Sequence, residues 1–213
     1  MKRTRTTILG LALASLAAAA WAQQQTKPLS PPGAASTQVG GSWTAASGGG
    51  GPRYSGGKWI EVDYGRPILR GRKNIFGSGA DYGKGVDAGA LVWRAGAGPT
   101  TKLSTEVPII IAGKTLPPGT YDVLVDLKES GWTFILSTQK TEDQYDPNEK
   151  TAMWGSFGYD PKWDVLRAPM TLSRLPHSVD QFTISFLDMT ESGGTLAMEW
   201  ETTEALLKFS LAR

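Results

Sequence analysis

Apolar and polar side chains alternate strictly in several short runs, and this alternation constrains the fold more than any other feature of the chain. The clearest runs lie at residues 120–127, 132–136, 182–186 and 196–200. Because successive side chains of a β-strand point to opposite faces, a period of two with β-branched and aromatic residues predicts strands with one buried face. The chain is therefore expected to be all-β, with about nine short strands. The further candidate strands lie at residues 59–64, 101–105, 107–111, 165–172 and 206–211.

Turn residues separate these runs. Pro117-Pro118-Gly119 precedes the first run and Glu129-Ser130-Gly131 follows it, so residues 119–127 and 131–137 form the most secure hairpin. No segment shows a helical stripe of four turns, and residues 87–93 are the best candidate for a short helix. Strands at this spacing predict a single antiparallel β-sandwich, of which a jelly roll is one form.

The N-terminus has the pattern of a secretory signal peptide. Three basic residues near the start are followed by an apolar stretch at residues 8–20 and by Ala20-Trp21-Ala22, whose small residues suit signal peptidase. Cleavage is expected after Ala22, which makes residues 1–22 the signal peptide and the processed protein periplasmic or secreted. The alternative is an N-terminal membrane anchor, but the stretch is shorter than the about 20 apolar residues that cross a bilayer.

Charge and cysteine content limit the partners. The chain has 22 basic and 20 acidic residues, and three basic residues leave with the signal peptide, so 19 remain against 20. A net charge of −1 favours neither nucleic acid nor an anionic membrane as a partner. No later segment is long and apolar enough to span a membrane, so we expect a soluble processed protein. Because the chain has no cysteine, the fold must rest on its own core.

Residues 23–56 differ in composition from the rest. They are rich in Gln, Ser, Ala, Pro and Gly, include the run Gly48–Gly51, and hold few charged or large apolar residues apart from Trp43. Such a segment buries too little apolar surface to offset its ordering entropy. We therefore expect a disordered, flexible tether at residues 23–56 and the β-sandwich domain at residues 57–213.

Four arginines and two aromatic residues form the main candidate site. Guanidinium groups bind carboxylate or phosphate through paired hydrogen bonds, and Trp or Tyr can stack on a ring. This combination predicts a pocket for a small anionic or sugar-like ligand. The constellation comprises Arg66, Arg70, Arg72, Arg94, Tyr64 and Trp93, and the residues predicted to bind are Tyr64, Arg66, Arg72, Trp93 and Arg94.

A purely structural explanation of the arginines competes with this prediction. Arg66 and Arg94 would then pair with acidic residues and fix loops to the sheet. The candidate partners are Asp63, Asp87 and Asp164.

The tryptophans pose a similar choice between core and ligand. Trp132 and Trp200 are in phase with apolar neighbours and are expected in the core, whereas Trp59 is out of phase and is expected to face outward. The aromatic loop at residues 154–163 is expected to cover the core, with sugar stacking as the alternative.

The sequence lacks the residues that several kinds of catalysis require. The only histidine, His177, lies in a predicted loop, and no Gly-x-Ser-x-Gly motif is present, which argues against a Ser-His-Asp triad. One histidine and no cysteine are too few for a catalytic zinc site. Calcium binding by the acidic stretch at residues 142–149 is the alternative to a solvated loop, which fits the spacing better. We therefore assign no catalytic residue, metal or cofactor.

Several strings of residues occur in a characteristic order and spacing. As a set they resemble the bacterial domain-of-unknown-function family 2911, over roughly Trp59 to Arg213. The resemblance implies an exported, β-rich protein without an established activity. The strings include Tyr64-Gly65-Arg66-Pro67, Gly71-Arg72, Ile75-Phe76-Gly77, Val92-Trp93-Arg94-Ala95-Gly96 and Gly119-Thr120-Tyr121.

These observations favour a non-catalytic exported binding or structural module over an enzyme. Its partner would be a small anionic or carbohydrate ligand, or a component of the cell envelope. The alternative is a hydrolase that acts on glycans through two carboxylates, which would have to lie within about 10 Å of each other. A mechanical role in the envelope, with residues 23–55 as a spacer, is a third hypothesis.

Overall fold

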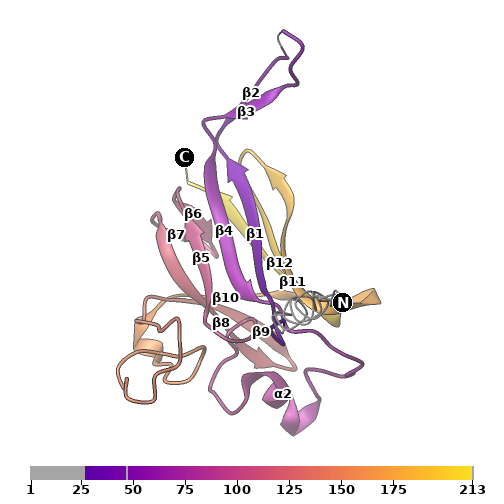
Figure 1. The fold of residues 1–213 in the computed structure, drawn as a ribbon, viewed down its shortest axis with the longest axis vertical. Coiled ribbons are helices and arrows are strands. Elements are labelled where there is room, and N and C mark those ends of the chain that lie inside the picture. Colours follow the sequence, from indigo (N-terminus) through magenta and orange to yellow (C-terminus); the bar gives the residue numbers. More distant parts are fainter. Residues whose placement is uncertain (1–26, 47, 213) are drawn as a thin grey trace, which may run out of the picture.

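The computed structural model describes residues 27–46 and 48–212, which form a β-sandwich with a projecting hairpin (Figure 1). The larger sheet has six strands in the order β1 (Pro32–Val39), β4 (Lys58–Gly65), β5 (Thr101–Thr105), β8 (Gly119–Lys128), β9 (Gly131–Ser137) and β10 (Asp164–Pro169). The smaller sheet has four, in the order β11 (Thr171–Thr190), β12 (Gly193–Leu211), β6 (Ile109–Ile111) and β7 (Lys114–Leu116). The hairpin consists of β2 (Ser42–Thr44) and β3 (Arg53–Ser55).

All paired strands are antiparallel, so the predicted all-β sandwich is confirmed. The most secure predicted hairpin is present as β8 and β9, with Val125 opposite Phe134 and Lys128 opposite Gly131. The two main sheets contain ten strands, two more than a jelly roll.

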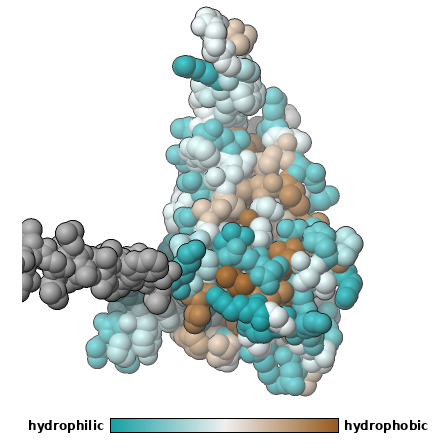
Figure 2. Space-filling model, turned by 45° about the vertical axis from the view of Figure 1, so that its right-hand side comes forward, coloured by the Kyte–Doolittle hydropathy of each residue, from teal (hydrophilic) through white to brown (hydrophobic). Residues whose placement is uncertain are grey.

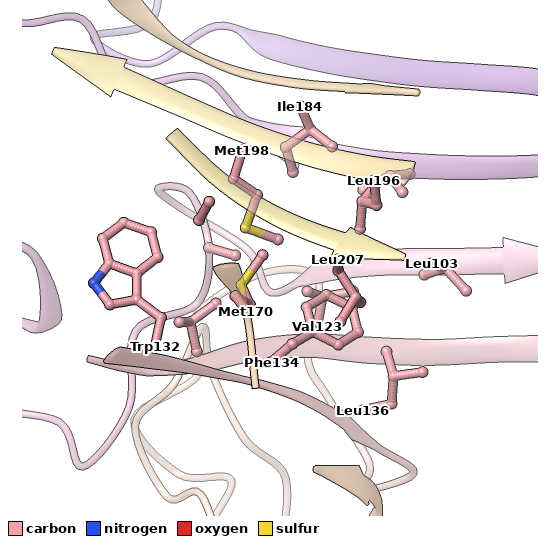
Figure 3. Close-up of a cluster of buried hydrophobic side chains, with 14 of the residues drawn as sticks. Leu103, Val123, Trp132, Phe134, Leu136, Met170, Ile184, Leu196, Met198 and Leu207 are labelled. Atoms are coloured by element: carbon pink, nitrogen blue, oxygen red, sulfur yellow. The ribbon is translucent and has the colours of Figure 1, made fainter. Parts of the chain in front are cut away.

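The core lies between the two sheets and is filled by side chains that the alternation predicted to be buried (Figure 3). Trp200 is also buried, whereas Trp59 is 41% exposed, and both findings agree with the phase of their strands. Each fully buried apolar side chain contributes about 1.5–3 kcal/mol, so this core is the main source of stability in a chain without disulfides. The residues at its centre include Trp132, Phe134, Leu136, Leu196 and Met198, each at most 2% exposed.

Five aromatic residues pack together at one end of the core. Trp93 lies at the centre of this cluster, with its ring 5.0 Å from that of Phe182 and stacked at 6.3 Å on that of Trp200. Phe76 and Trp132 complete the cluster with a ring distance of 4.7 Å. Trp93 lies outside the named strands, but its backbone exchanges two hydrogen bonds of 2.8 Å with Val125 of β8. The long connection between β4 and β5 is thereby fixed to the sandwich.

The prediction of a disordered tether is wrong for residues 32–39, 42–44 and 53–55, which form β1, β2 and β3. Strand β1 pairs with β4 over eight residue pairs, from Pro32 opposite Gly65 to Val39 opposite Lys58. Its side chains are mostly small, and β1 is held by backbone pairing along a sheet edge rather than by extensive apolar burial, so composition does not reveal it. The predicted signal peptide at residues 1–22 lies outside the described residues.

The smaller sheet contains longer strands than predicted. The candidate strands at residues 196–200 and 206–211 are two halves of the 19-residue β12. Between them Glu201 adopts a left-handed backbone with φ 53°, where the register of the pairing with β11 shifts. Polar residues interrupt the alternation at this bend, so the sequence predicts two strands where the chain forms one bent strand.

The helical content is small. The predicted helix at residues 87–93 is wrong, because the single α-helix of the described residues, α2, spans Lys84–Asp87. It ends there because Ala88 and Gly89 both adopt positive φ, at 55° and 88°. Short 3-10 turns occur at Gly79–Asp81 and Pro161–Trp163. None of the helices in the described residues has the length and hydrophobicity needed to cross a membrane.

The loop between β9 and β10 covers the outer face of the larger sheet. Its Met153 is fully buried against Leu124 and Ile135, and together with Val92 these residues form a second, smaller core. Of the aromatic loop at residues 154–163, Tyr159 packs on this second core, whereas Phe157 and Trp163 are exposed. The expected cover over the main core is therefore wrong, because the loop lies on the outer face of the larger sheet.

Candidate functional site

Two neighbouring depressions lie beside the end of β4, where the chain enters its long connection to β5. We name the first the Arg72 depression; it has a volume of about 350 Å³. It collects residues that are far apart in sequence, from the segment before β1, the β4–β5 connection and β12. The residues that define it are Leu29, Arg70, Arg72, Val86, Trp93 and Trp200.

Arg72 is the best-positioned side chain of this depression. Its Nε and Nη2 donate to the carbonyls of Leu69 and Ile68 at 3.0 and 2.8 Å, which fixes the guanidinium close to its own loop. The guanidinium carbon lies 5.8 Å from the ring centre of Trp200, a cation–π distance. Nη1 has no partner among the described residues, so its N–H groups remain able to bind an anion.

Arg70 supplies the second positive charge. Its Nη2 donates to the carbonyl of Leu29 at 2.6 Å, and its Nε and Nη1 have no partner in the described part of the chain. Arg70 adopts a left-handed backbone with φ 50°, an uncommon conformation for a non-glycine residue that turns the loop sharply.

A carboxylate from β12 holds the far end of the arginine loop. The two oxygens of Glu201 accept hydrogen bonds from the backbone N–H groups of Asn74 and Ile75, at 2.6 and 3.0 Å. Hydrogen bonds to a charged acceptor are worth about 1.5–3 kcal/mol when partly shielded from water. The loop that carries Arg70 and Arg72 is thus anchored to a strand of the sandwich.

None of the four arginines pairs with a carboxylate within residues 27–46 and 48–212. The alternative in which Arg66 and Arg94 pair with aspartates is therefore wrong for these side chains. Asp164 pairs instead with Arg167, at 2.8 Å. No acidic residue of the described chain lines the Arg72 depression.

Arg66 has an architectural position and does not line either depression. Its Nε and Nη2 donate to the carbonyl of Phe182 and the hydroxyl of Thr183, at 3.2 and 3.0 Å, which ties the end of β4 to β11. Its side chain lies across Gly33 of β1, where a Cβ would come within 2.2 Å of Arg66 Cδ. The segment predicted to be a tether therefore packs directly on Arg66.

Arg94 also fixes a loop and lines neither depression. Its Nη1 donates to the carbonyl of Gly98 at 2.6 Å, and its guanidinium lies 5.4 Å from the ring centre of Phe157. Gly155 lies against the guanidinium so closely that a Cβ there would come within 2.2 Å of Nη1. Burial lowers the pKa of Arg94, but an arginine remains charged at any physiological pH.

Trp93 does not offer a ring face to a ligand. Its side chain is only 1% exposed, and its Nε1 donates to the carbonyl of Gly96 at 3.1 Å. The hypothesis that Trp93 stacks on a bound ring is therefore wrong; the residue belongs to the aromatic cluster that supports the depression from below.

The second depression, which we name the Tyr64 depression, has a volume of about 380 Å³. The hydroxyl of Tyr64 accepts a hydrogen bond from the backbone N–H of Ile184 at 2.9 Å, so this side chain also joins the two sheets. Two carboxylates and one ammonium group line the same depression, from Asp63, Asp143 and Lys102.

Lys102 of β5 binds two polar side chains, those of Asp122 on β8 and of Thr141. Its Nζ donates to Asp122 Oδ1 at 3.0 Å and to the hydroxyl of Thr141 at 2.6 Å. Burial raises the pKa of Asp122, while the bond and charge of Lys102 act in the opposite direction. Lys102 therefore forms an ion pair with a nearly buried carboxylate and adds little uncompensated positive charge to the Tyr64 depression.

The predicted site thus separates into parts. Arg72 and Trp93 meet in the Arg72 depression, Tyr64 lies in the second depression, and Arg66 and Arg94 fix loops nearby. The predicted ligand-binding set leaves out Arg70 and Trp200. Trp200 lies more than a hundred residues away from the arginines in sequence and in phase with the core, so no local signal indicates its second role beneath Arg72.

Fold and site together define a class of protein: an antiparallel β-sandwich with an arginine-lined depression beside the end of β4. The chain matches the model of the family described as protein of unknown function (DUF2911) over residues 52–209, and it belongs to that family. The resemblance found in the sequence is thereby confirmed. Comparison with curated proteins gave no match, and comparison with solved structures gave none either. The matched region begins inside the β2–β3 hairpin, so β1 and β2 precede it.

Proposed function

We propose that the protein is a non-catalytic exported binding module for a small anionic ligand, which it binds in the Arg72 depression. One observation carries the proposal: two guanidinium groups line a depression that has no acidic residue among its described lining residues. Carboxylate and phosphate groups match the N–H groups that Arg70 and Arg72 retain.

The surroundings favour a ligand with a short apolar part. Leu29 and Val86 line the same depression, while the rings of Trp93 and Trp200 are almost fully buried. A ligand would therefore contact the outer side of the Arg72 guanidinium rather than an indole face. Small organic acids and sugar acids fit this description, and both are plausible ligands for a protein outside the cytoplasm.

Loss of both guanidinium groups is expected to abolish anion binding. Each charge-assisted hydrogen bond is worth about 1.5–3 kcal/mol, so Arg70→Ala with Arg72→Ala removes at least about 3 kcal/mol and should weaken binding at least about a hundredfold. Calorimetric titration with citrate, galacturonate and inorganic phosphate measures the effect. Arg72→Lys should also bind more weakly, because an ammonium group lacks the planar fork.

Arg53→Ala is the matched control, because Arg53 is an exposed arginine on β3 in the hairpin, outside the Arg72 depression. Equal loss of affinity in this variant and in the double variant would point to nonspecific charge attraction. Wild-type affinity in the folded double variant would remove the Arg72 depression as the binding site.

A carboxylate-based hydrolase acting on glycans is the second candidate, and one observation favours it. Asp63 and Asp143 line the same depression, and two catalytic carboxylates of a glycosidase must share a cleft. If this candidate is correct, Asp63→Asn and Asp143→Asn will each reduce hydrolysis of p-nitrophenyl glycosides by at least about a hundredfold. Glu106→Gln, at an exposed carboxylate outside the depression, serves as the control. Absence of any hydrolysis by the wild-type protein would rule the candidate out.

A further inference from the structure

The β2–β3 hairpin is the feature that neither depression explains. Figure 1 shows it rising beyond the ends of β1 and β4, away from the sandwich. Trp43 lies on β2 and is 70% exposed, which makes it the most exposed tryptophan of the described residues. Its side chain has no role in the core and leaves most of its surface available to a ligand.

The hairpin is held in a defined position by Tyr54, which lies opposite Trp43 in the register. The Tyr54 hydroxyl accepts a hydrogen bond from the backbone N–H of Gly41 at 2.8 Å. Its ring lies against Gly41 and Gly57, where a Cβ would in each case come within 2.5 Å of the ring. Trp43 contacts the same ring, with 5.3 Å between ring centres and planes tilted by 56°. Trp43 is therefore supported from one side and exposed on the other.

An open hollow of about 1090 Å³ lies beside this aromatic pair, between the hairpin and the turn that joins β11 to β12. Apart from the two rings, it offers an amide, hydroxyl groups and a single carboxylate. Ligand sites of this kind combine an apolar surface with a few hydrogen-bonding groups that fix orientation. The residues that carry this chemistry are Gln38, Ser42, Trp43, Tyr54, Thr190 and Glu191.

The charge of the hairpin indicates what kind of ligand fits. From Gly40 to Gly57 the sequence has one charged residue, Arg53. Figure 2 shows the hairpin in mostly pale colours, neither strongly hydrophilic nor strongly hydrophobic. Nucleic acid and anionic lipid require clusters of positive charge, and an apolar partner requires a broad hydrophobic surface. A neutral ligand with alternating apolar and hydroxyl-bearing surfaces matches the hollow better.

We propose that the hairpin and the β11–β12 turn form a binding site for a neutral carbohydrate chain. The apolar C–H face of a pyranose ring would pack on the exposed face of Trp43, as apolar groups pack on aromatic rings elsewhere. Gln38 and Glu191 would exchange hydrogen bonds with its hydroxyl groups. This site is at the hairpin, separate from the Arg72 depression, and does not depend on an anion being bound there.

The test is a calorimetric titration of the processed protein with the neutral oligosaccharides cellohexaose, maltohexaose and hexa-N-acetylchitohexaose. At least one hexaose is expected to bind, and Trp43→Ala should weaken that binding about tenfold, the effect of losing about 1.4 kcal/mol of aromatic contact. Trp43→Tyr should retain most of the affinity because it keeps a ring. Trp163→Ala is the control, since Trp163 is also exposed but lies in the loop over the larger sheet.

Three results would overturn the proposal. One is the absence of binding by the wild-type protein at about 10 mM of every hexaose, a concentration that nearly fills a millimolar site. Another is unchanged affinity in Trp43→Ala. The third is a Trp43-dependent dimer in sedimentation velocity, which would assign the exposed ring to contact between two copies of the chain. Circular dichroism confirms that each variant is folded before titration.

Discussion

Replacing Trp93 with alanine is expected to lower the free energy of unfolding by about 3–5 kcal/mol, the range for large aromatic residues removed from a core. The side chain is 1% exposed and contacts the rings of Phe182 and Trp200. Its loss would leave a cavity at the centre of the aromatic cluster and the carbonyl of Gly96 without its donor. Because native domains are stable by only about 5–15 kcal/mol, the variant would be close to unfolding.

Urea unfolding followed by circular dichroism measures this effect. Trp163→Ala provides the comparison, because it removes the same side chain at a position that is 47% exposed, and it should change the stability by less than about 1 kcal/mol. Equal stability of the two variants would contradict the structural role of Trp93 and restore the hypothesis that its ring serves a ligand.

Removing β1 is expected to abolish cooperative unfolding. A chain that begins at Lys58 loses eight residue pairs with β4 and leaves β4 as an open edge of the larger sheet. It also loses Val39 from the core and Gly33 from beneath Arg66. An unpaired edge strand with a hydrophobic face tends to associate with other chains, so the shortened protein should aggregate or unfold without a sharp transition.

The matched control removes residues 42–55 and joins Gly41 to Gly56. This change deletes the hairpin but keeps β1, and the four glycines Gly40, Gly41, Gly56 and Gly57 then form a flexible loop between the paired residues Val39 and Lys58. The hairpinless protein should unfold cooperatively, with a midpoint close to that of the wild type. If instead the chain that begins at Lys58 unfolds as sharply as the full one, residues 32–39 are the dispensable tether that their composition predicts.

The alternation at residues 120–127 and 132–136 correctly identifies β8 and β9 as strands. It does not predict that both faces of these strands are buried at Tyr121–Val125 and Phe134–Ser137, because the loop that covers Leu124 and Ile135 is far from them in sequence. It fails for β1, whose small residues Ala34, Ala35 and Ser36 give no apolar signal. That strand exists because β4 offers unsatisfied backbone groups, a property of the assembled sheet rather than of the segment itself.

The site is less predictable than the fold for a related reason. An arginine side chain can donate hydrogen bonds either to a ligand or to backbone carbonyl groups of its own protein, and the sequence does not distinguish the two roles. Arg66 and Arg94 donate to carbonyls of segments that only the fold brings near. Arg72 resembles them in sequence but retains unpaired N–H groups over Trp200, and this contrast depends on a contact between the β4–β5 connection and β12.

The bend of β12 at Glu201 has a consequence for recognition. The Glu201 carboxylate accepts the N–H groups of Asn74 and Ile75 and so ties the arginine loop to a strand of the smaller sheet. A receptor that is already ordered loses little conformational entropy when a ligand arrives, so more of the contact energy remains as affinity. If the proposed function is correct, the two guanidinium groups are preorganised, and a small anion would be bound without first having to order the loop that holds them.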